Sequence, residues 1–282
     1  MTYDLAAMAR RQRNIRRRSI TLPPVTVPAM FGTDLFRSCY LPIIEGWTAA
    51  APGIVAEYER SLSELTTDAP GDISRVLRLA AEEMLRLVLT LTPRLRDWTV
   101  RVERWQRNRW RGAVLSATSV DLQTMLGPET ARQSMERTIA WNVDLIRDVS
   151  EQTRQRIGAA VFSGLNERRP AREVAKQISE AVGMARSRSM RVASDQLSKL
   201  SSQLAAERRR EAGLTVFKHR HSGKLHPRAN HKARDGKLFS EQAEDIGKEV
   251  DGQRVSEAPP ANDRAGIPPY CGCREQGVIL WD

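Results

Sequence analysis

The sequence predicts a mainly helical protein, with an extended helical body and a small carboxy-terminal α+β module of short strands. Three observations carry this prediction. Apolar residues recur at three- and four-residue steps through most of residues 29–213, as they do on one face of an α-helix. After Gly213 this periodicity ends and short β-prone runs begin. All 4 histidines and two of the 3 cysteines fall in that last part of the chain.

Breaks in the pattern divide the chain into four segments. A length of 282 residues is enough for about two domains with sizeable cores. The expected segments are a basic arm with a proline-rich linker (1–28), an amino-terminal helical region (29–126), a second helical region (127–213) and the carboxy-terminal module with its His/Cys cluster (214–282).

The first segment combines a cluster of arginines with a proline-containing stretch. A block of like charge is typical of a flexible arm that becomes ordered on a partner. Two interpretations stay open: contact with DNA or a portal protein, and a solubilising tail. Residues 21–28 contain three prolines, which predicts an extended linker. The arginines assigned here to nucleic-acid binding are Arg10, Arg11, Arg13, Arg16, Arg17 and Arg18.

Helical spacing dominates the second segment. A first helix is predicted over residues 34–65, with an interruption near Pro52. Residues 69–72 mark a break in which Asp72 is suited to cap the next helix. Apolar residues at helical spacing then predict a clear amphipathic helix over residues 73–88.

A further helix is predicted from Pro93 to about Thr118, with tryptophans and arginines interleaved. Such a helix can bind nucleic acid through phosphate contacts and stacking. Tryptophans at helical spacing are more often core residues, and we prefer that interpretation for Trp98 and Trp105. The arginines around the helix stay a candidate electropositive face, and those assigned to nucleic-acid binding are Arg104, Arg107, Arg109 and Arg111.

The second half of the chain continues the helical pattern up to Gly213. A long helix is expected to follow Gly127 and to reach Leu165, and Pro170 is placed to open a short one. The last helix, over residues 185–212, carries a narrow apolar seam. Beyond it, residues 215–217, 237–239 and 278–281 are β-prone and predict a small sheet.

Charge and hydropathy narrow the choice of partners. A net charge of +11 favours an anionic partner, of which nucleic acid is the leading candidate. No apolar run approaches the ~20 residues of a membrane-spanning helix, so we expect no membrane anchor. An isolated Cys39 beside one close pair of cysteines does not make a disulfide framework.

The histidines and the close cysteine pair offer the donors that zinc prefers, imidazole and thiolate. Few large apolar residues lie between Gly236 and Pro269, so a bound metal would help this segment to fold. Two other interpretations remain open, a solvated basic loop and a local disulfide. The disulfide is disfavoured because cysteines two positions apart rarely reach its geometry.

Seven residues of this module form a pattern: Arg228, His231, Gly236, Pro268, Pro269, Cys271 and Cys273. In this order and context they resemble the phage Mu F-like head morphogenesis family. The likeness extends upstream over residues 142–213 and covers roughly the second half of the chain, and it says little about residues before Thr130. Two positions depart from the family's pattern. Lys224 stands where an acidic residue is usual, and Gly272 replaces the arginine between the cysteines.

The resemblance implies a minor head protein of a tailed phage, present in low copy and not an enzyme. Its expected partners are a portal protein, capsid or scaffold proteins and packaged double-stranded DNA, with no small-molecule substrate. It would reside in the virion, in the capsid interior or at the portal vertex, after assembly in the host cytoplasm, and would be a candidate for ejection with the DNA. We expect structural Zn²⁺ held by His226, His231, Cys271 and Cys273.

Catalytic patterns are missing from the sequence. It contains neither a phosphate-binding Gly-x-x-x-x-Gly-Lys loop nor a nucleophile elbow, so no catalytic residue is assigned. The alternative is a metal-dependent DNA-binding protein or nuclease that acts outside the particle. In that case His231 would be the general base, and His226 and Asp235 would help to hold the ion.

Overall fold

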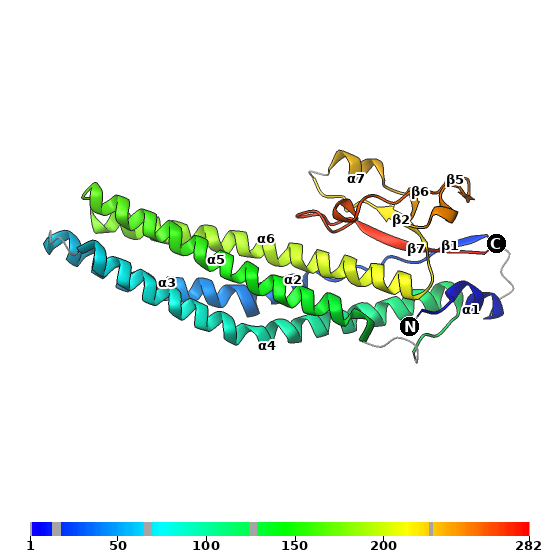
Figure 1. The fold of residues 1–282 in the computed structure, drawn as a ribbon, viewed down its shortest axis with the longest axis horizontal. Coiled ribbons are helices and arrows are strands. Elements are labelled where there is room, and N and C mark those ends of the chain that lie inside the picture. The colour runs from blue at the N-terminus through cyan, green and yellow to red at the C-terminus, as the bar shows by residue number, and fades with distance from the viewer. Residues whose placement is uncertain (1, 13–17, 65–68, 124–128, 226–227, 282) are drawn as a thin grey trace. The chain divides into compact units, whose positions relative to one another are not determined.

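The structure is a computed structural model whose secondary structure is mainly helical, with a small sheet near the carboxy terminus, as predicted (Figure 1). The residues that it describes are 2–12, 18–64, 69–123, 129–225 and 228–281. The chain forms two compact units, and neither coincides with a predicted segment. We call residues 32–98 and 138–193 the helical unit, and residues 1–31, 99–137 and 194–282 the module unit.

The unit boundaries differ from the predicted ones because long helices contribute to both units. These helices are α4 (Ala69–Thr118), α5 (Arg132–Asn166) and α6 (Ala171–Glu211). The helical unit also contains a π-helical turn (Phe36–Tyr40), which follows α2 (Met30–Leu35), and α3 (Leu41–Glu64).

Buried polar contacts join the helices of the helical unit. The Tyr40 hydroxyl donates to Asn142 Oδ1 at 2.8 Å, and Trp47 Nε1 donates to Ser150 Oγ at 3.0 Å. Because both pairs are buried, each fixes the rotation of α3, or of the turn before it, against α5.

Three predicted interruptions are wrong. Helix α3 continues through Pro52, α4 continues through Pro93, and α6 runs unbroken from Ala171 to Glu211. Both prolines occupy exposed helix positions, where the lost backbone hydrogen bond is solvated. Leu91 and Leu95 are buried on either side of Pro93, so core packing keeps α4 helical there. Asp72 accordingly lies inside α4 and accepts a hydrogen bond from Arg60 at 2.8 Å.

The module unit contains a five-stranded sheet in the order β1-β7-β2-β3-β6. Its strands are β1 (Ser19–Thr21), β2 (Val216–Arg220), β3 (Leu238–Ser240), β6 (Ser256–Glu257) and β7 (Arg274–Leu280). Only the β3–β6 pair is parallel in this sheet. A separate hairpin pairs β4 (Glu249–Val250) with β5 (Gln253–Arg254). The three predicted β-prone runs overlap β2, β3 and β7.

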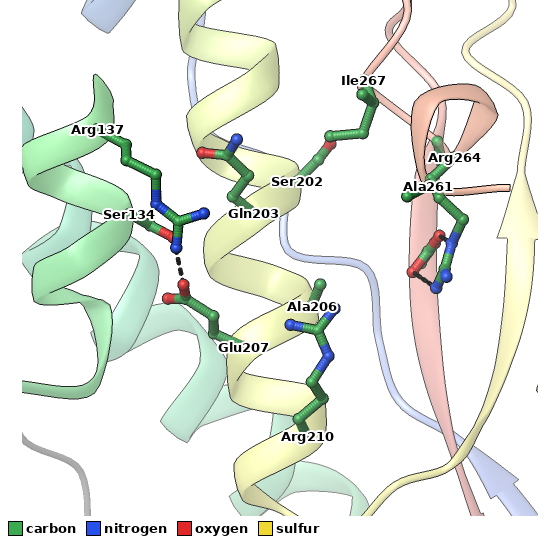
Figure 2. A pocket seen from close by; sticks show the side chains of 12 residues that line it. Ser134, Arg137, Ser202, Gln203, Ala206, Glu207, Arg210, Ala261, Arg264 and Ile267 are labelled. Atoms are coloured by element: carbon green, nitrogen blue, oxygen red, sulfur yellow. Dashed lines mark hydrogen bonds and ion pairs between the residues drawn. The ribbon is translucent and has the colours of Figure 1, made fainter. Parts of the chain in front are cut away.

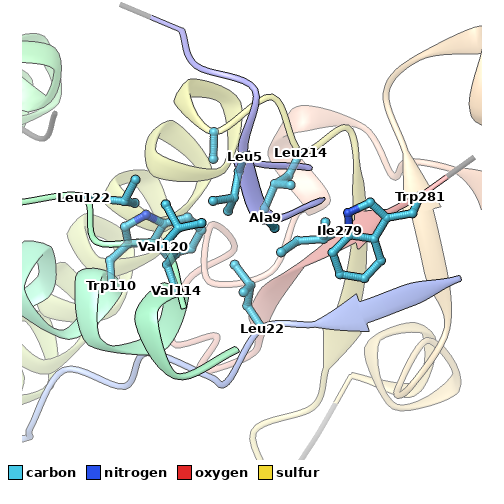
Figure 3. Close-up of a cluster of buried hydrophobic side chains, with 11 residues drawn as sticks. Leu5, Ala9, Leu22, Trp110, Val114, Val120, Leu122, Leu214, Ile279 and Trp281 are labelled. Atoms are coloured by element: carbon cyan, nitrogen blue, oxygen red, sulfur yellow. The ribbon is translucent and has the colours of Figure 1, made fainter. Parts of the chain in front are cut away.

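The prediction of a flexible arm is wrong for the described part of the amino-terminal segment. Residues Leu5–Gln12 form α1, and β1 pairs with β7, with Ile20 opposite Ile279. Leu5 and Ala9 are completely buried and point into a cluster with Leu214 and Trp281 (Figure 3). Burial of the apolar face of α1 thus keeps this segment packed on the module unit in spite of its arginines. The linker prediction fails at Thr21, which belongs to β1.

A buried ionic network lies within the module unit. Arg208 of α6 donates to Glu103 of α4 at 2.6 Å and to Glu211 at 2.9 Å. The side chains of Arg208 and Glu103 are 1% and 2% exposed. Low exposure strengthens the attraction within the pair and makes either charge costly to leave alone.

Candidate metal centre

His219 reaches the interior of the module because of its place in β2. Side chains alternate across a strand, so His219 lies on the same face as Phe217, and both are buried. The ring of His219 stands edge-on to that of His231, with centroids 5.6 Å apart. Burial, and next the charge of His231, lower the pKa of His219, which favours the neutral imidazole that binds metals.

His231 is presented by the short helix α7 (Ala229–Ala233), shown beside the sheet in Figure 1. Its side chain is buried, and Nε2 lies 2.9 Å from Asp263 Oδ1. Arg234 donates to the other oxygen of Asp263 at 2.7 Å. Burial alone would raise the pKa of Asp263, but the hydrogen bonds with His231 and Arg234 outweigh it and lower that pKa. Asp263 is therefore a carboxylate that orients the His231 ring.

Cys271 and Cys273 lie in the turn before β7, and α6 holds that turn. Asp195 of α6 accepts a hydrogen bond from the Tyr270 N–H at 2.5 Å. Tyr270 has a φ of 60°, an unusual value for a residue other than glycine. The Gly266 N–H points at Cys271 Sγ at 3.4 Å. These contacts place both sulfur atoms in the module interior.

The side chains of His219, His231 and Cys273 form a buried group whose donor atoms lie within 4.8 Å of one another. Cys271 Sγ lies 3.4 Å from His231 Nδ1, so a second thiol lies beside this group. The Nε2 atom of His219 is buried and has no hydrogen-bond partner among the described residues. A buried polar atom without a partner is costly, and a metal ion would satisfy this one. The group can therefore hold a metal ion.

The two thiols are electrostatically unequal. A hydrogen bond from Cys273 lowers the pKa of Cys271 to about 4, and the same bond raises the pKa of Cys273. This inequality favours the thiolate at Cys271, and a bound cation would favour loss of the second proton.

Of the predicted ligands, His231 and Cys273 belong to this group, and Cys271 lies beside it. The predicted fourth ligand, His226, lies outside the described residues. The histidine that accompanies His231 in the group is His219. Sequence reasoning missed His219, although its two-residue spacing from Phe217 on a β-prone run could have indicated an inward side chain. Asp235, assigned to the ion in the nuclease alternative, is not in the group and accepts a hydrogen bond from the His221 N–H at 2.9 Å.

The arginines assigned to nucleic-acid binding are not all equally exposed. Arg104 and Arg109 of α4 are exposed, and Arg109 stacks over the Trp105 ring at 5.4 Å. Arg107 lies 3.5 Å from Glu103, and Arg111 lies 3.6 Å from Asp121, so both are partly neutralised. In the amino-terminal segment Arg10, Arg11 and Arg18 are exposed, whereas Arg13, Arg16 and Arg17 lie outside the described residues.

The tryptophans of α4 follow the core prediction only in part. Trp98 is completely buried in the helical unit, as expected. Trp105 is half-buried, with the Phe31 ring 6.3 Å from its own. Trp110, which the sequence did not single out, is buried in the module unit.

A polar cavity of about 360 Å³ lies elsewhere in the module unit, between α6, the start of α5 and the loop that carries Arg264 (Figure 2). Ser134 donates a hydrogen bond to Glu207 across it. Burial raises the pKa of Glu207, and the hydrogen bond from Ser134 opposes that rise. Arg264 pairs with Glu275 at 2.9 Å, so the charges that line this cavity are largely balanced within the protein. The lining therefore favours no particular ligand charge.

Comparisons with known proteins identify no relative of this chain. No family model, curated protein or solved structure matches the chain. Within the described ranges, no helix combines the length and the hydropathy needed to cross a bilayer.

Proposed function

We propose that this chain is a structural, DNA-associated minor head protein whose carboxy-terminal module is held together by one zinc ion. The observation that carries the metal assignment is the buried group of His219, His231 and Cys273, with Cys271 beside it. The head assignment is carried by the resemblance of residues 221–274 to the Mu F-like family.

The donor set suits tetrahedral zinc. Two imidazoles and two thiolates form a common structural zinc site. With sulfur about 2.3 Å and nitrogen about 2.0–2.1 Å from the ion, adjacent donors lie about 3.6 Å apart. The 3.4 Å between Cys271 Sγ and His231 Nδ1 is close to that edge. In this arrangement His231 would bind zinc through Nδ1, while its Nε2 keeps the hydrogen bond with Asp263. A carboxylate hydrogen-bonded to the other ring nitrogen is usual for a histidine that binds zinc.

Burial supports a structural ion more than a catalytic one. His219 and His231 are each 1% exposed, and both cysteines are 4% exposed. A general base must reach the proton that it removes, and the buried His231 is held by Asp263. A zinc ion here would instead join β2, α7 and the turn before β7.

Metal analysis of untagged protein, purified without chelators, tests the zinc assignment. We expect close to one zinc per chain in the wild type and a large loss in His219→Ala. His221→Ala is the matched control, because His221 lies two residues away and outside the donor group. Zinc lost equally from both variants, or no zinc in the wild type, would refute the assignment.

The head role is supported by the resemblance and by the net charge of +11, which suits a partner as anionic as packaged DNA. Quantitative mass spectrometry of purified particles from the source that encodes this chain tests it. We expect the protein at low copy relative to the portal protein. Absence from mature particles, with abundance in producing cells, would instead indicate an assembly factor or a protein that acts on DNA outside the particle.

A further inference from the structure

A second pocket of the module unit is lined by hydroxyl groups. It has a volume of about 180 Å³, more than the roughly 10–15 Å³ that one water molecule requires. Ser194, Ser198, Ser201 and Ser202 of α6 line one wall, and their spacing places them on one helix face. The side chains of Ser201 and Ser202 make no hydrogen bond within the described part of the chain. The pocket therefore presents hydroxyls that are free to donate.

The charged side chains that line this pocket are all positive. Lys224 and Arg274 line it, and no aspartate or glutamate does. Lys224 Nζ donates to the Tyr270 carbonyl oxygen at 2.7 Å, and Arg274 donates to the Thr26 hydroxyl. Among the described residues neither cation pairs with a carboxylate, in contrast to Arg264 in the cavity of Figure 2. Two uncompensated cations beside free hydroxyls are suited to an anion with several acceptor oxygens.

Gly272 lets the lysine lie over the pocket. A Cβ atom at position 272 would stand 3.1 Å from Lys224 Cε and 3.1 Å from Ser222 Cβ, closer than most such contacts. A side chain at position 272 would therefore require Lys224 or Ser222 to shift slightly. The two positions that depart from the Mu F-like pattern are thus in contact with each other, and together they set one wall of the pocket.

We propose that this pocket binds a phosphate group, either free or as part of a DNA backbone. The serine hydroxyls and the two cationic side chains would donate to its oxygens. This proposal does not rest on the head role. Lys224, Arg274 and the serines are not in the metal-binding group, but Cys273 of that group also lines the pocket, so zinc content is measured beside phosphate binding.

Binding of inorganic phosphate at constant ionic strength, followed by calorimetry, tests the pocket. We expect Lys224→Met combined with Arg274→Gln to weaken binding at least about tenfold, because charge-assisted hydrogen bonds are lost. The matched control is Lys237→Met with Arg254→Gln, which removes the same charge from exposed residues outside the pocket. Ser201→Ala with Ser202→Ala removes only the two hydroxyls without a partner among the described residues, and it should also weaken phosphate binding. Alanine favours the helix, so this variant is expected to fold.

A short DNA duplex, followed by fluorescence anisotropy, distinguishes the two sources of phosphate. If the pocket variant loses affinity for both ligands and the control keeps it, the pocket takes a backbone phosphate. If only inorganic phosphate binding falls, the pocket takes a free phosphate. Equal behaviour of pocket and control variants toward inorganic phosphate, with zinc content unchanged, would overturn the proposal.

Discussion

Replacing Leu5 by alanine is the most direct test of whether the amino-terminal segment is part of the folded module unit. Leu5 is completely buried against Trp110, Leu214 and Ile279 (Figure 3). The substitution removes three carbon atoms, worth about 2.4 kcal/mol at about 0.8 kcal/mol each. The cavity that remains raises the expected loss of unfolding free energy to about 3–5 kcal/mol.

Urea unfolding followed by tryptophan fluorescence measures this loss, because Trp110 belongs to the same cluster. The matched control is Leu225→Ala, since Leu225 is 93% exposed and its truncation is expected to cost less than about 0.5 kcal/mol. If Leu5→Ala cost no more than Leu225→Ala, the segment would be undocked in solution. The assignment of α1 to the module unit would then be wrong.

Three other substitutions have defined outcomes. Arg208→Leu should lower the unfolding free energy by about 3–5 kcal/mol. Glu103→Leu with Arg208→Leu should recover part of that loss in the same urea assay, because Glu103 is no longer buried without Arg208, while Glu211 still loses this partner. Asp263→Asn should weaken zinc binding about 10–100-fold in a competition with a chelating dye, because the His231 ring loses its orienting carboxylate. Burial opposes the charged form of Asp245, but hydrogen bonds from Lys248 and others outweigh it and lower its pKa. The Asp245 carboxylate therefore stabilises the fold above the ordinary aspartate pKa of about 3.9, and this stabilisation is lost as pH falls through the lowered pKa. Asp245→Asn should therefore flatten the acid side of the plot of melting temperature against pH. Parallel plots for the wild type and the variant would contradict this.

The sequence predicted where most of the helices lie, but it predicted poorly where they begin and end. Periodicity reports which face of a helix is buried, and that information was sufficient for most of α3, α4 and α6. It does not report whether packing on both sides of a proline keeps a helix continuous, which is decided by residues such as Leu91 and Leu95. The amino-terminal segment was mispredicted for a related reason. Its arginines dominate the composition, while a few apolar residues, among them Leu5, Ala9 and Leu22, are fully buried in the cluster.

The sequence predicted the types of donor in the candidate metal centre, but not all of the individual residues that supply them. The close spacing of Cys271 and Cys273 is visible in the sequence, as is the wealth of histidine nearby. The choice among the histidines depends on the sheet, because only strand alternation turns His219 inward. Asp263 lies 32 residues from His231, so only the folded chain brings them together.

A zinc ion at the proposed site would also explain how a segment with few apolar residues stays ordered. Between β3 and β7 the described core consists of small contributions, such as Val250 and Val255 in one cluster and Ala265 in another. A zinc ion bound at the proposed site would fix both ends of this segment, through His231 before it and Cys271 after it. Through Asp263 it would also fix a point within the segment. The same ion would hold the turn that carries Gly272, so the proposed phosphate pocket and the proposed zinc site would share that turn and Cys273.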